Sequence, residues 1–324
     1  MKSITKLALV AISIFAIACS KSSTDENLVA PVIDNTLILT KTERTVANPI
    51  RNLTYYWWCT KLDSGDKFAF HTDATGMMFY DIDTNTFADK TSSPEFVGGG
   101  SLESRLLSDG GGGLFYISNS FNKYNEITNT WSSFPSGSAI FPSNIHTNFG
   151  RAGAVTLSSK GRLYYVGGLG LGTTVKYFNW TNNSWNYVAG YPIPIGSSPK
   201  LTTDKVDKIY ALGGSSSIDG SPINKLCVFD VTKNTWTELA EAPKFPAYEY
   251  SRNTIVVFKN HIIYLGLDKK LYVYDIQTNK WQTTAFETDI YNAADTHLEL
   301  STDGSKIYLI YKKSNSAIGI QEYK

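Results

Sequence analysis

The sequence predicts an all-β fold in which six four-stranded units close into a ring, a six-bladed β-propeller. An eight-residue phrase that begins and ends with an aromatic residue, and has Asn in sixth place, occurs five times. A short apolar, aromatic-rich run precedes each phrase, and a sixth run stands near the C-terminus. Units that recur at roughly 45–50 residues predict a propeller or a solenoid, because one unit cannot bury its own apolar face.

The repeated phrase predicts the end of one strand, a polar turn, and a second strand that opens on a large ring. Asn tolerates φ > 0 better than most residues, so the sixth place suits the left-handed position of a turn. The copies span residues 80–87, 124–131, 178–185, 229–236 and 274–281. Their sixth-place residues are Asn85, Asn129, Asn183, Asn234 and Asn279.

The apolar runs predict the second strand of each blade. Each follows a turn-forming cluster, such as the Gly-rich stretch at 110–113, as a hairpin strand should. The runs lie at residues 67–70, 113–117, 162–168, 208–214, 262–266 and 306–310.

The sixth run has no complete phrase after it, so its blade lacks a strand. Residues 36–48 resemble the segment that follows the closing aromatic of other repeats, and we expect them to supply that strand beside the C-terminal one. Closure by both ends of the chain would leave no long exposed strand edge. The expected propeller therefore spans residues 36–324.

Two blades carry a fuller signature, a double glycine followed by two spaced aromatics. Gly167-Gly168 is followed by Phe178 and Trp185, and Gly213-Gly214 by Phe229 and Trp236. This pattern resembles the kelch motif, so the chain is similar to the kelch family of β-propellers over nearly all of the expected mature chain. The family includes enzymes, scaffold proteins and sugar binders, so the resemblance predicts the fold more firmly than the function.

The first 35 residues predict export and a lipid anchor. Residues 1–18 have a short basic start and an apolar run too short to span a membrane, which is typical of a signal peptide. Residues 16–19 resemble a bacterial lipoprotein cleavage box, with Cys19 as the lipidated residue; an ordinary secretory signal or a short anchor is the alternative. Residues 19–35 are then the lipidated Cys and a polar tether. We expect an extracytoplasmic protein anchored in the cell envelope, with outer-membrane sorting compatible with Ser20.

Composition excludes several classes of function. The formal net charge is +1, which gives neither a nucleic-acid footprint nor an acidic tail. We expect no nucleic-acid partner, no cofactor and a monomer. With Cys19 lipidated, Cys59 and Cys227 fall in blades one and four, too far apart for a disulfide, so two thiols are expected.

The sequence shows no pattern of residues typical of a metal site. The four histidines are scattered, and no two have the spacing of metal ligands, so no metal site is expected. The kelch family includes a copper oxidase, but no matching ligand set aligns here. Residues 81–85 resemble a calcium loop only superficially, because they lack the Gly and Glu that complete it.

One pattern suggests a ligand site. Basic or imidazole side chains stand 8 to 11 residues before the second-strand runs, where each blade's innermost strand should begin at the mouth of the central channel. They are Arg105, Arg151, Lys200, Arg252 and His297, with Tyr56 and Trp57 in blade one. A ring of this kind favours an anionic ligand, because the guanidinium fork suits a carboxylate. The alternative is that these side chains pair with Glu103, Glu249 and Glu299.

Aromatic residues near the same mouth, among them Tyr191, Phe245 and Tyr250, suit stacking on sugar rings or ordinary packing of blade edges. Two functions remain open. One is a non-catalytic module that binds a glycan, an acidic sugar or a protein at the propeller face. The other resembles the kelch-type N-acetylneuraminate mutarotases, for which Glu249 or Glu103 could supply the acid/base group.

Overall fold

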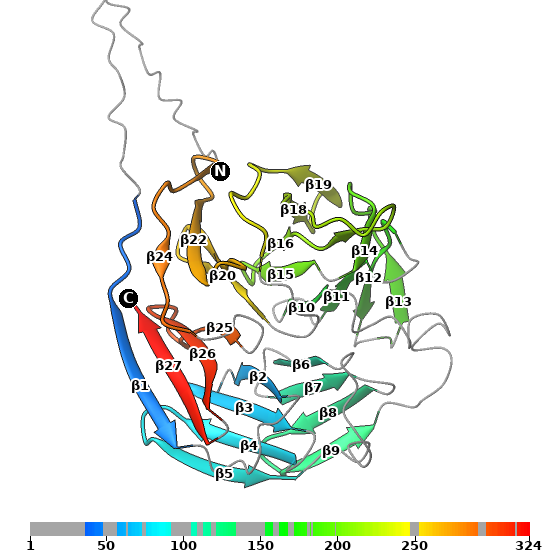
Figure 1. Cartoon of the computed structure of the whole chain (residues 1–324). Coiled ribbons are helices and arrows are strands. Elements are labelled where there is room, and N and C mark those ends of the chain that lie inside the picture. The colour runs from blue at the N-terminus through cyan, green and yellow to red at the C-terminus, as the bar shows by residue number, and fades with distance from the viewer. Residues whose placement is uncertain are drawn as a thin grey trace, which may run out of the picture. The chain divides into compact units, whose positions relative to one another are not determined.

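Six antiparallel sheets stand around a common axis and form a six-bladed β-propeller (Figure 1). The structure is a computed structural model, and residues Thr36–Lys324 form one compact unit. It describes residues 36–47, 57–62, 64–72, 76–91, 105–108, 113–117, 121–133, 153–157, 162–167, 172–179, 182, 184–197, 199–246, 253–290, 296–314 and 316–324. The predicted fold class is confirmed.

Blades one to three are four-stranded meanders, with strands ordered from the axis outward. Blade one contains β2 (Trp57–Leu62), β3 (Lys67–Thr72), β4 (Gly76–Asp81) and β5 (Thr86–Lys90). Blade two contains β6 (Arg105–Ser108), β7 (Gly113–Ile117), β8 (Phe121–Asn125) and β9 (Thr130–Ser133). Blade three contains β10 (Gly153–Leu157), β11 (Arg162–Val166), β12 (Val175–Asn179) and β13 (Ser184–Tyr187).

Blades four and five repeat the meander and add short strands. Blade four contains β15 (Lys200–Thr203), β16 (Lys208–Leu212), β18 (Leu226–Asp230) and β19 (Thr235–Glu238). A two-stranded sheet lies beside it, formed by β14 (Ile195–Ser197) and β17 (Ser215–Ser216). Blade five contains β20 (Ile255–Phe258), β21 (His261–Leu265), β22 (Lys270–Asp275), β23 (Lys280–Trp281) and β24 (Phe286–Glu287), which pairs with β22.

Blade six joins the two ends of the propeller. It contains β25 (Thr296–Leu300), β26 (Ile307–Ser314), β27 (Ala317–Tyr323) and β1 (Lys41–Ala47). β1 pairs with β27 in an antiparallel register that runs from Lys41 opposite Tyr323 to Ala47 opposite Ala317. The predicted closure by an N-terminal strand is therefore confirmed.

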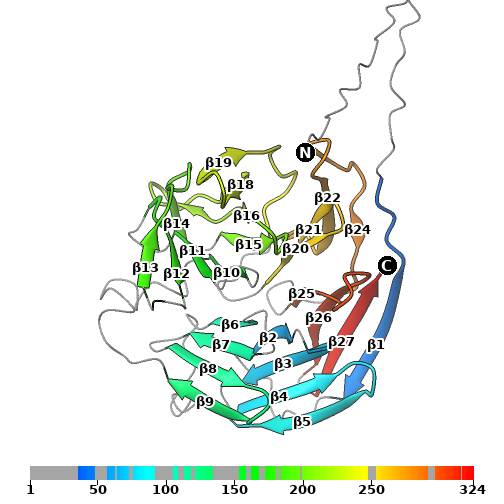
Figure 2. The ribbon, with the colours of Figure 1, turned by 180° about the vertical axis from the view of Figure 1, so that it is seen from behind.

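The first strands of the blades surround the axis. Contacts link β2 to β6, β6 to β10, β10 to β15, β15 to β20, β20 to β25, and β25 back to β2. Both views show these six strands nearest the centre (Figures 1 and 2). We call the end of the axis at which these strands begin the mouth, and the opposite end the far end.

The repeated phrase forms the turn between the third and fourth strands. The sixth-place residues Asn85, Asn129, Asn234 and Asn279 have φ between 52° and 56°, as predicted, and Asn183 lies outside the described residues. The second-place residue caps the turn: the Asp230 carboxylate, for example, accepts the backbone N–H groups of Thr232 and Lys233 at 3.0 and 2.9 Å. Asp81 accepts those of Asp83 and Thr84 in the same way, so its carboxylate serves the turn.

In blades two, four and five the same phrase also joins the blade to the preceding one. Asn234 Oδ1 accepts the backbone N–H of Ala189 at 2.9 Å, and Trp236 Nε1 donates to the carbonyl of the same residue at 2.9 Å. Equivalent pairs join Asn129 and Trp131 to Thr91, and Asn279 and Trp281 to Ala240. Two side chains two positions apart thus satisfy both backbone groups of one residue, which explains why Asn and Trp recur together.

Backbone conformation and close packing explain why the first residue of the double glycine must be Gly. Gly167 and Gly213 have φ of +78° and +74°, a conformation that L side chains rarely adopt. A Cβ on Gly167 would lie 2.5 Å from Ile195 Cδ1, and one on Gly213 would lie 2.5 Å from Pro246 Cγ. The first glycine of the motif therefore lets the chain that leads into the next blade pack closely.

The apolar cores lie between neighbouring blades. Leu298 packs with Val256 and Leu265 between blades five and six, whereas Ile310 packs with Cys59 and Phe68 between blades six and one. Cys59 and Cys227 are both buried and form no disulfide, as expected. Among the described residues, no helix has the length and apolar character that crossing a membrane requires.

Candidate functional site

Three of the predicted site residues occupy the same register position near the mouth. Arg105 lies opposite Ile117, Lys200 opposite Leu212, and His297 opposite Ile310. Each partner is the fifth residue of its apolar run. The three residues therefore stand at one level of the ring of inner strands, on blades two, four and six.

The other two basic residues precede that level. Gly153 lies opposite Val166 in blade three, and Thr254 accepts the backbone N–H of Leu265 in blade five, so they occupy the equivalent position. Arg151 and Arg252 come two positions earlier in sequence and lie outside the described residues. Tyr56, Tyr250, Glu103, Glu249 and Cys19 also lie outside them.

The two ring residues whose side chains are described are both buried. Lys200 and His297 are buried, with 5% and 1% of their surface exposed. For Arg105 and Trp57 the structure describes the backbone, which begins β6 and β2 respectively. The side chains of Lys200 and His297 are therefore largely removed from solvent.

Glu299, two residues after His297 on β25, brings a carboxyl to the axis. Its side chain accepts hydrogen bonds from the side chain of Asn253 and from the backbone N–H of Lys61. Asn253 is fixed in turn, because its carbonyl accepts the backbone N–H of Leu298 at 2.7 Å and its Nδ2 donates to the Leu298 carbonyl at 3.0 Å. Glu299 therefore bridges blades five, six and one.

Lys61 places a positive charge on the blade-one side of this carboxyl. Its residue is 7% exposed, and its Nζ donates to the carbonyl of Leu62 at 2.9 Å. Lys61 also acts electrostatically on Asp66, whose carboxylate accepts the hydroxyl of Tyr308 at 2.7 Å and the backbone N–H of Thr302 at 2.6 Å. These contacts connect the turns of blades one and six at the far end.

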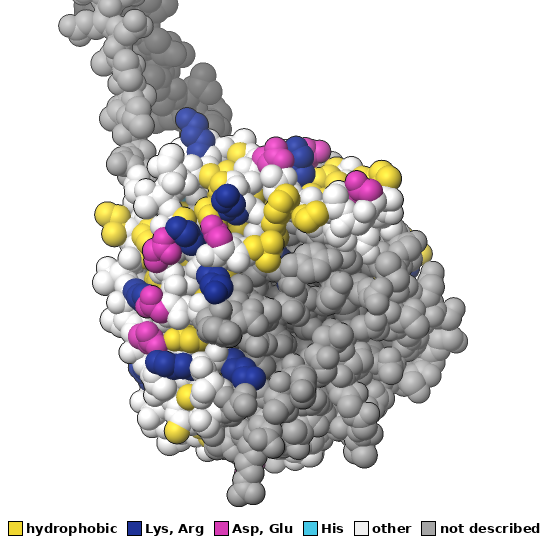
Figure 3. Space-filling model, in the orientation of Figure 1, with side chains coloured by type: hydrophobic (Ala, Val, Ile, Leu, Met, Phe, Trp, Pro, Cys, Tyr) yellow, Lys and Arg dark blue, Asp and Glu magenta, His cyan; other side chains and the backbone are white. Residues whose placement is uncertain are grey.

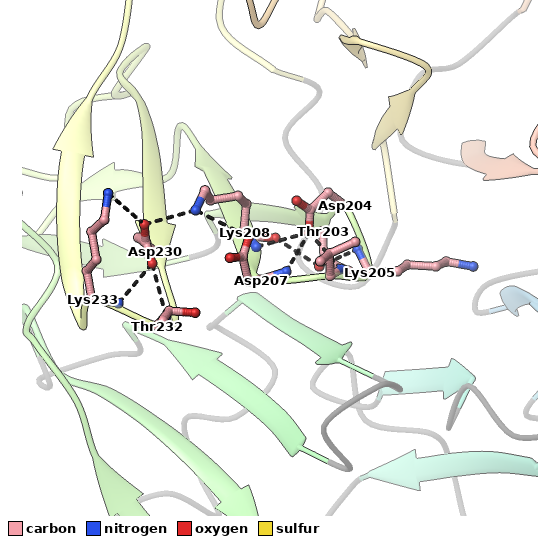
Figure 4. A network of polar contacts seen from close by, with 9 residues as sticks. Thr203, Asp204, Lys205, Asp207, Lys208, Asp230, Thr232 and Lys233 are labelled. Atoms are coloured by element: carbon pink, nitrogen blue, oxygen red, sulfur yellow. Dashed lines mark hydrogen bonds and ion pairs between the residues drawn. The ribbon is translucent and has the colours of Figure 1, made fainter. Parts of the chain in front are cut away.

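Lys205 approaches Glu299 from blade four. It stands in the turn after β15 with φ of 63°, and that turn is held by Asp204, whose Oδ1 accepts the backbone N–H groups of Val206, Asp207 and Lys208. Lys208 is anchored to Asp230 at 2.9 Å. In Figure 4 the Lys205 side chain extends away from this network, and its charge acts on Glu299.

Burial dominates the acidity of Glu299. It raises the pKa of this carboxyl to about 7, against the opposing effects of Lys61, Lys205 and the two hydrogen bonds. A carboxyl with such a pKa exchanges its proton near neutral pH, which is the property that a general acid/base or a proton-linked binding site uses.

The two described aromatic candidates, Tyr191 and Phe245, differ in exposure. Tyr191 is buried and meets Trp236 edge-to-face at 4.9 Å, so it does not offer a sugar-stacking surface. Phe245 is 38% exposed. Within the described ranges, no group of three His, Cys, Asp or Glu side chains is placed to hold a metal ion.

Charges on the outer surface are mixed. Figure 3 shows Lys and Arg side chains alternating with Asp and Glu over blades five and six. Several are paired, as Lys270 is with Glu287 and Lys313 with Glu43 at 2.5 and 3.0 Å. These pairs are largely exposed, so solvent screens them and they contribute little to stability.

Sequence reasoning treated Glu299 only as a possible ion-pair partner. A signal was present, since Glu299 follows His297 at a spacing of two, which places both side chains on one face of the strand. The sequence could not show that Asn253 and Lys61 converge on it, because these residues come from three different blades.

The comparisons agree with this architecture. A family model for the Kelch motif matches residues 207–243, which lie in blade four. The solved structure of YjhT matches with a TM-score of 0.56 and 13% identity, over 84% of this chain and 98% of that chain. The search of curated proteins finds no match. The chain is therefore a six-bladed β-propeller with a Kelch motif in blade four, a fold that serves both binding and enzymatic modules.

Proposed function

We propose that the protein binds an anionic glycan or acidic sugar at the mouth of the propeller axis. The observation that carries the proposal is the common register of Arg105, Lys200 and His297 on three alternate blades. Cationic groups that converge on one narrow opening concentrate anions there, and a carboxylate suits the Arg fork.

The chain direction supports access to the mouth. β25 begins at the mouth, and the antiparallel pairings through β26 and β27 mean that β1 runs in the opposite direction. Lys41, which begins β1, is therefore at the far end. The proposed anchor, which precedes residue 36, is thus joined to the propeller through a strand that begins at the far end.

The arginines that precede the ring level supply the first test. A bidentate, desolvated Arg–carboxylate contact contributes about 1.5–3 kcal/mol. Arg151→Ala and Arg252→Ala are each expected to weaken binding of glucuronate or N-acetylneuraminate roughly tenfold to a hundredfold. Titration calorimetry of the purified full-length protein measures the dissociation constants.

Lys233→Ala is the matched control for this test. It removes the same charge from the far end, where Lys233 is 77% exposed beside Asp230. The control is expected to bind as the wild type does. Equal losses in all three variants, or no loss in either Arg variant, would contradict a site at the mouth.

We further propose that Cys19 is lipidated and anchors the protein on the extracytoplasmic side of the cell envelope. The proposal rests on residues 1–19, a basic and apolar leader that ends in a lipoprotein-like cleavage box. Cys19→Ser is expected to leave unprocessed precursor and to abolish labelling by fatty-acid analogues. Persistent lipid labelling in that variant would exclude Cys19 as the anchor.

A second candidate function is the mutarotation of an acidic sugar. Glu299 favours it, because anomer exchange needs a group that gives and takes a proton beside a site for the sugar carboxylate. Exchange between the anomers of N-acetylneuraminate, followed by NMR with the protein present, separates a mutarotase from a non-catalytic binder.

A further inference from the structure

We propose that Glu299 is the proton-binding residue of this axial site, so that an anionic ligand at the mouth binds together with a proton. The inference rests on the proposed function and adds its regulation, because it makes anion affinity depend on pH. The cationic ring attracts the anion, and Glu299 makes the affinity for that anion depend on protonation.

Glu299 lies on β25, farther from the mouth than His297 of the ring. His297 and Glu299 lie on the same strand two residues apart, which is about 7 Å along a β-strand. An anion held at the level of His297 would face the Glu299 carboxyl across that distance. Repulsion between two like charges about 7 Å apart in a partly desolvated site weakens binding of the anion by roughly tenfold or more.

The groups around Glu299 come from every neighbouring element. β2 contributes Lys61, the turn after β15 contributes Lys205, and the segment before β20 contributes Asn253. On β26, Tyr308 lies opposite Glu299, and its hydroxyl is bound to Asp66. His297 lies on the same face of β25, so its contribution must be separated from that of Glu299 in any test.

The direction of the coupling follows from these charges. A protonated Glu299 is neutral and does not repel an anion, whereas an ionised Glu299 does. Burial raises the pKa of the free carboxyl to about 7, so both forms are populated near neutral pH. A bound anion raises that pKa further, and a proton is taken up when the ligand binds.

Calorimetric titration of the full-length protein with glucuronate and with N-acetylneuraminate tests the inference. The dissociation constant of the wild type is expected to rise roughly three- to tenfold from pH 6 to pH 8. Titrations at pH 7.5 in phosphate and in Tris, which differ in ionisation enthalpy, should report uptake of about half a proton per ligand. Glu299→Gln should bind with nearly the same affinity at both pH values and take up much less.

His297→Asn is the control that locates the proton. It should retain most of the proton uptake, whatever its affinity, if Glu299 is the site. A Glu299→Gln variant that keeps the wild-type pH dependence, with His297→Asn losing it, would overturn the inference and leave the anion site intact. If neither acid binds the wild type even at pH 6, the proposed function itself fails.

A ligand-free measurement remains informative in every case. A carboxyl with a raised pKa makes the folded protein less stable as pH rises from the unfolded value of 4.5 towards 7. Wild-type stability should therefore fall relative to that of Glu299→Gln across this window in urea denaturation. Parallel curves for the two proteins would show that Glu299 is already ionised and would overturn the inference.

Discussion

Deletion of residues 36–47 is expected to leave the protein unfolded, because β1 completes blade six. Val46 is 5% exposed in the core between blades six and one, and Leu39 is 8% exposed in the core between blades five and six. Burial of each aliphatic side chain contributes about 2–4 kcal/mol. With seven residues of strand pairing added, the loss approaches the whole stability of a typical domain, about 5–15 kcal/mol.

Two neighbouring substitutions in β1 test whether this strand closes blade six, without shortening the chain. Val46→Asp places a charge in the core between blades six and one, and it should destabilise the protein by several kcal/mol, of the order of 3–5. Thr45→Asp lies on the exposed face, where Lys313 Nζ donates to Thr45 at 2.8 Å, and should be nearly neutral. Urea denaturation followed by tryptophan fluorescence measures both. A deleted protein with the wild-type transition, or equal effects of the two substitutions, would exclude closure by β1.

Acidification below pH 6.5 is expected to cost the fold about 3–5 kcal/mol through His71 alone. His71 lies on β3, is fully buried and stacks on Tyr116 of blade two at 4.9 Å. Burial lowers its pKa from 6.5 to about 3. In this pH range the unfolded chain binds a proton at His71 that the folded protein does not bind. Stability is therefore lost as pH falls from about 6.5 to about 3.

His71→Phe tests this prediction, since Phe keeps a stacking ring and removes the titrating group. The difference in unfolding free energy between the variant and the wild type should shift in favour of the variant by about 2–3 kcal/mol between pH 7 and pH 4. The contributions of other groups, including Glu299, cancel in that difference. A difference that stays constant over this range would show that His71 takes up a proton in the folded state.

The sequence predicted the features that are local. The Asn of the repeated phrase marks a turn that needs φ > 0, and Asn85 and Asn234 adopt it for that reason. The missing strand of blade six was predicted because a propeller cannot leave its ring open, and residues 41–47 supply it. Gly213 was identified from its motif, although the contact with Pro246 that excludes a Cβ is visible only in the structure.

The site was less predictable because it depends on register and on contacts between blades. Counting residues back from the apolar runs aligned Arg105, Lys200 and His297, but it allowed Arg151 and Arg252 to be two positions away, since turn lengths differ between blades. The spacing of Glu299 from His297 was not enough to distinguish it from Glu103 and Glu249 in the sequence. Its burial and its contacts with Asn253 and Lys61 arise only when three blades meet.

A crystal structure of the protein soaked with glucuronate is the most direct test of the central claim. The account predicts the sugar carboxylate at the mouth, within hydrogen-bond distance of at least two of Arg105, Arg151, Lys200, Arg252 and His297. It also predicts that Glu299 is the carboxyl closest to the bound sugar. Glucuronate bound on an outer blade surface, or at the far end beside Lys233, would contradict it.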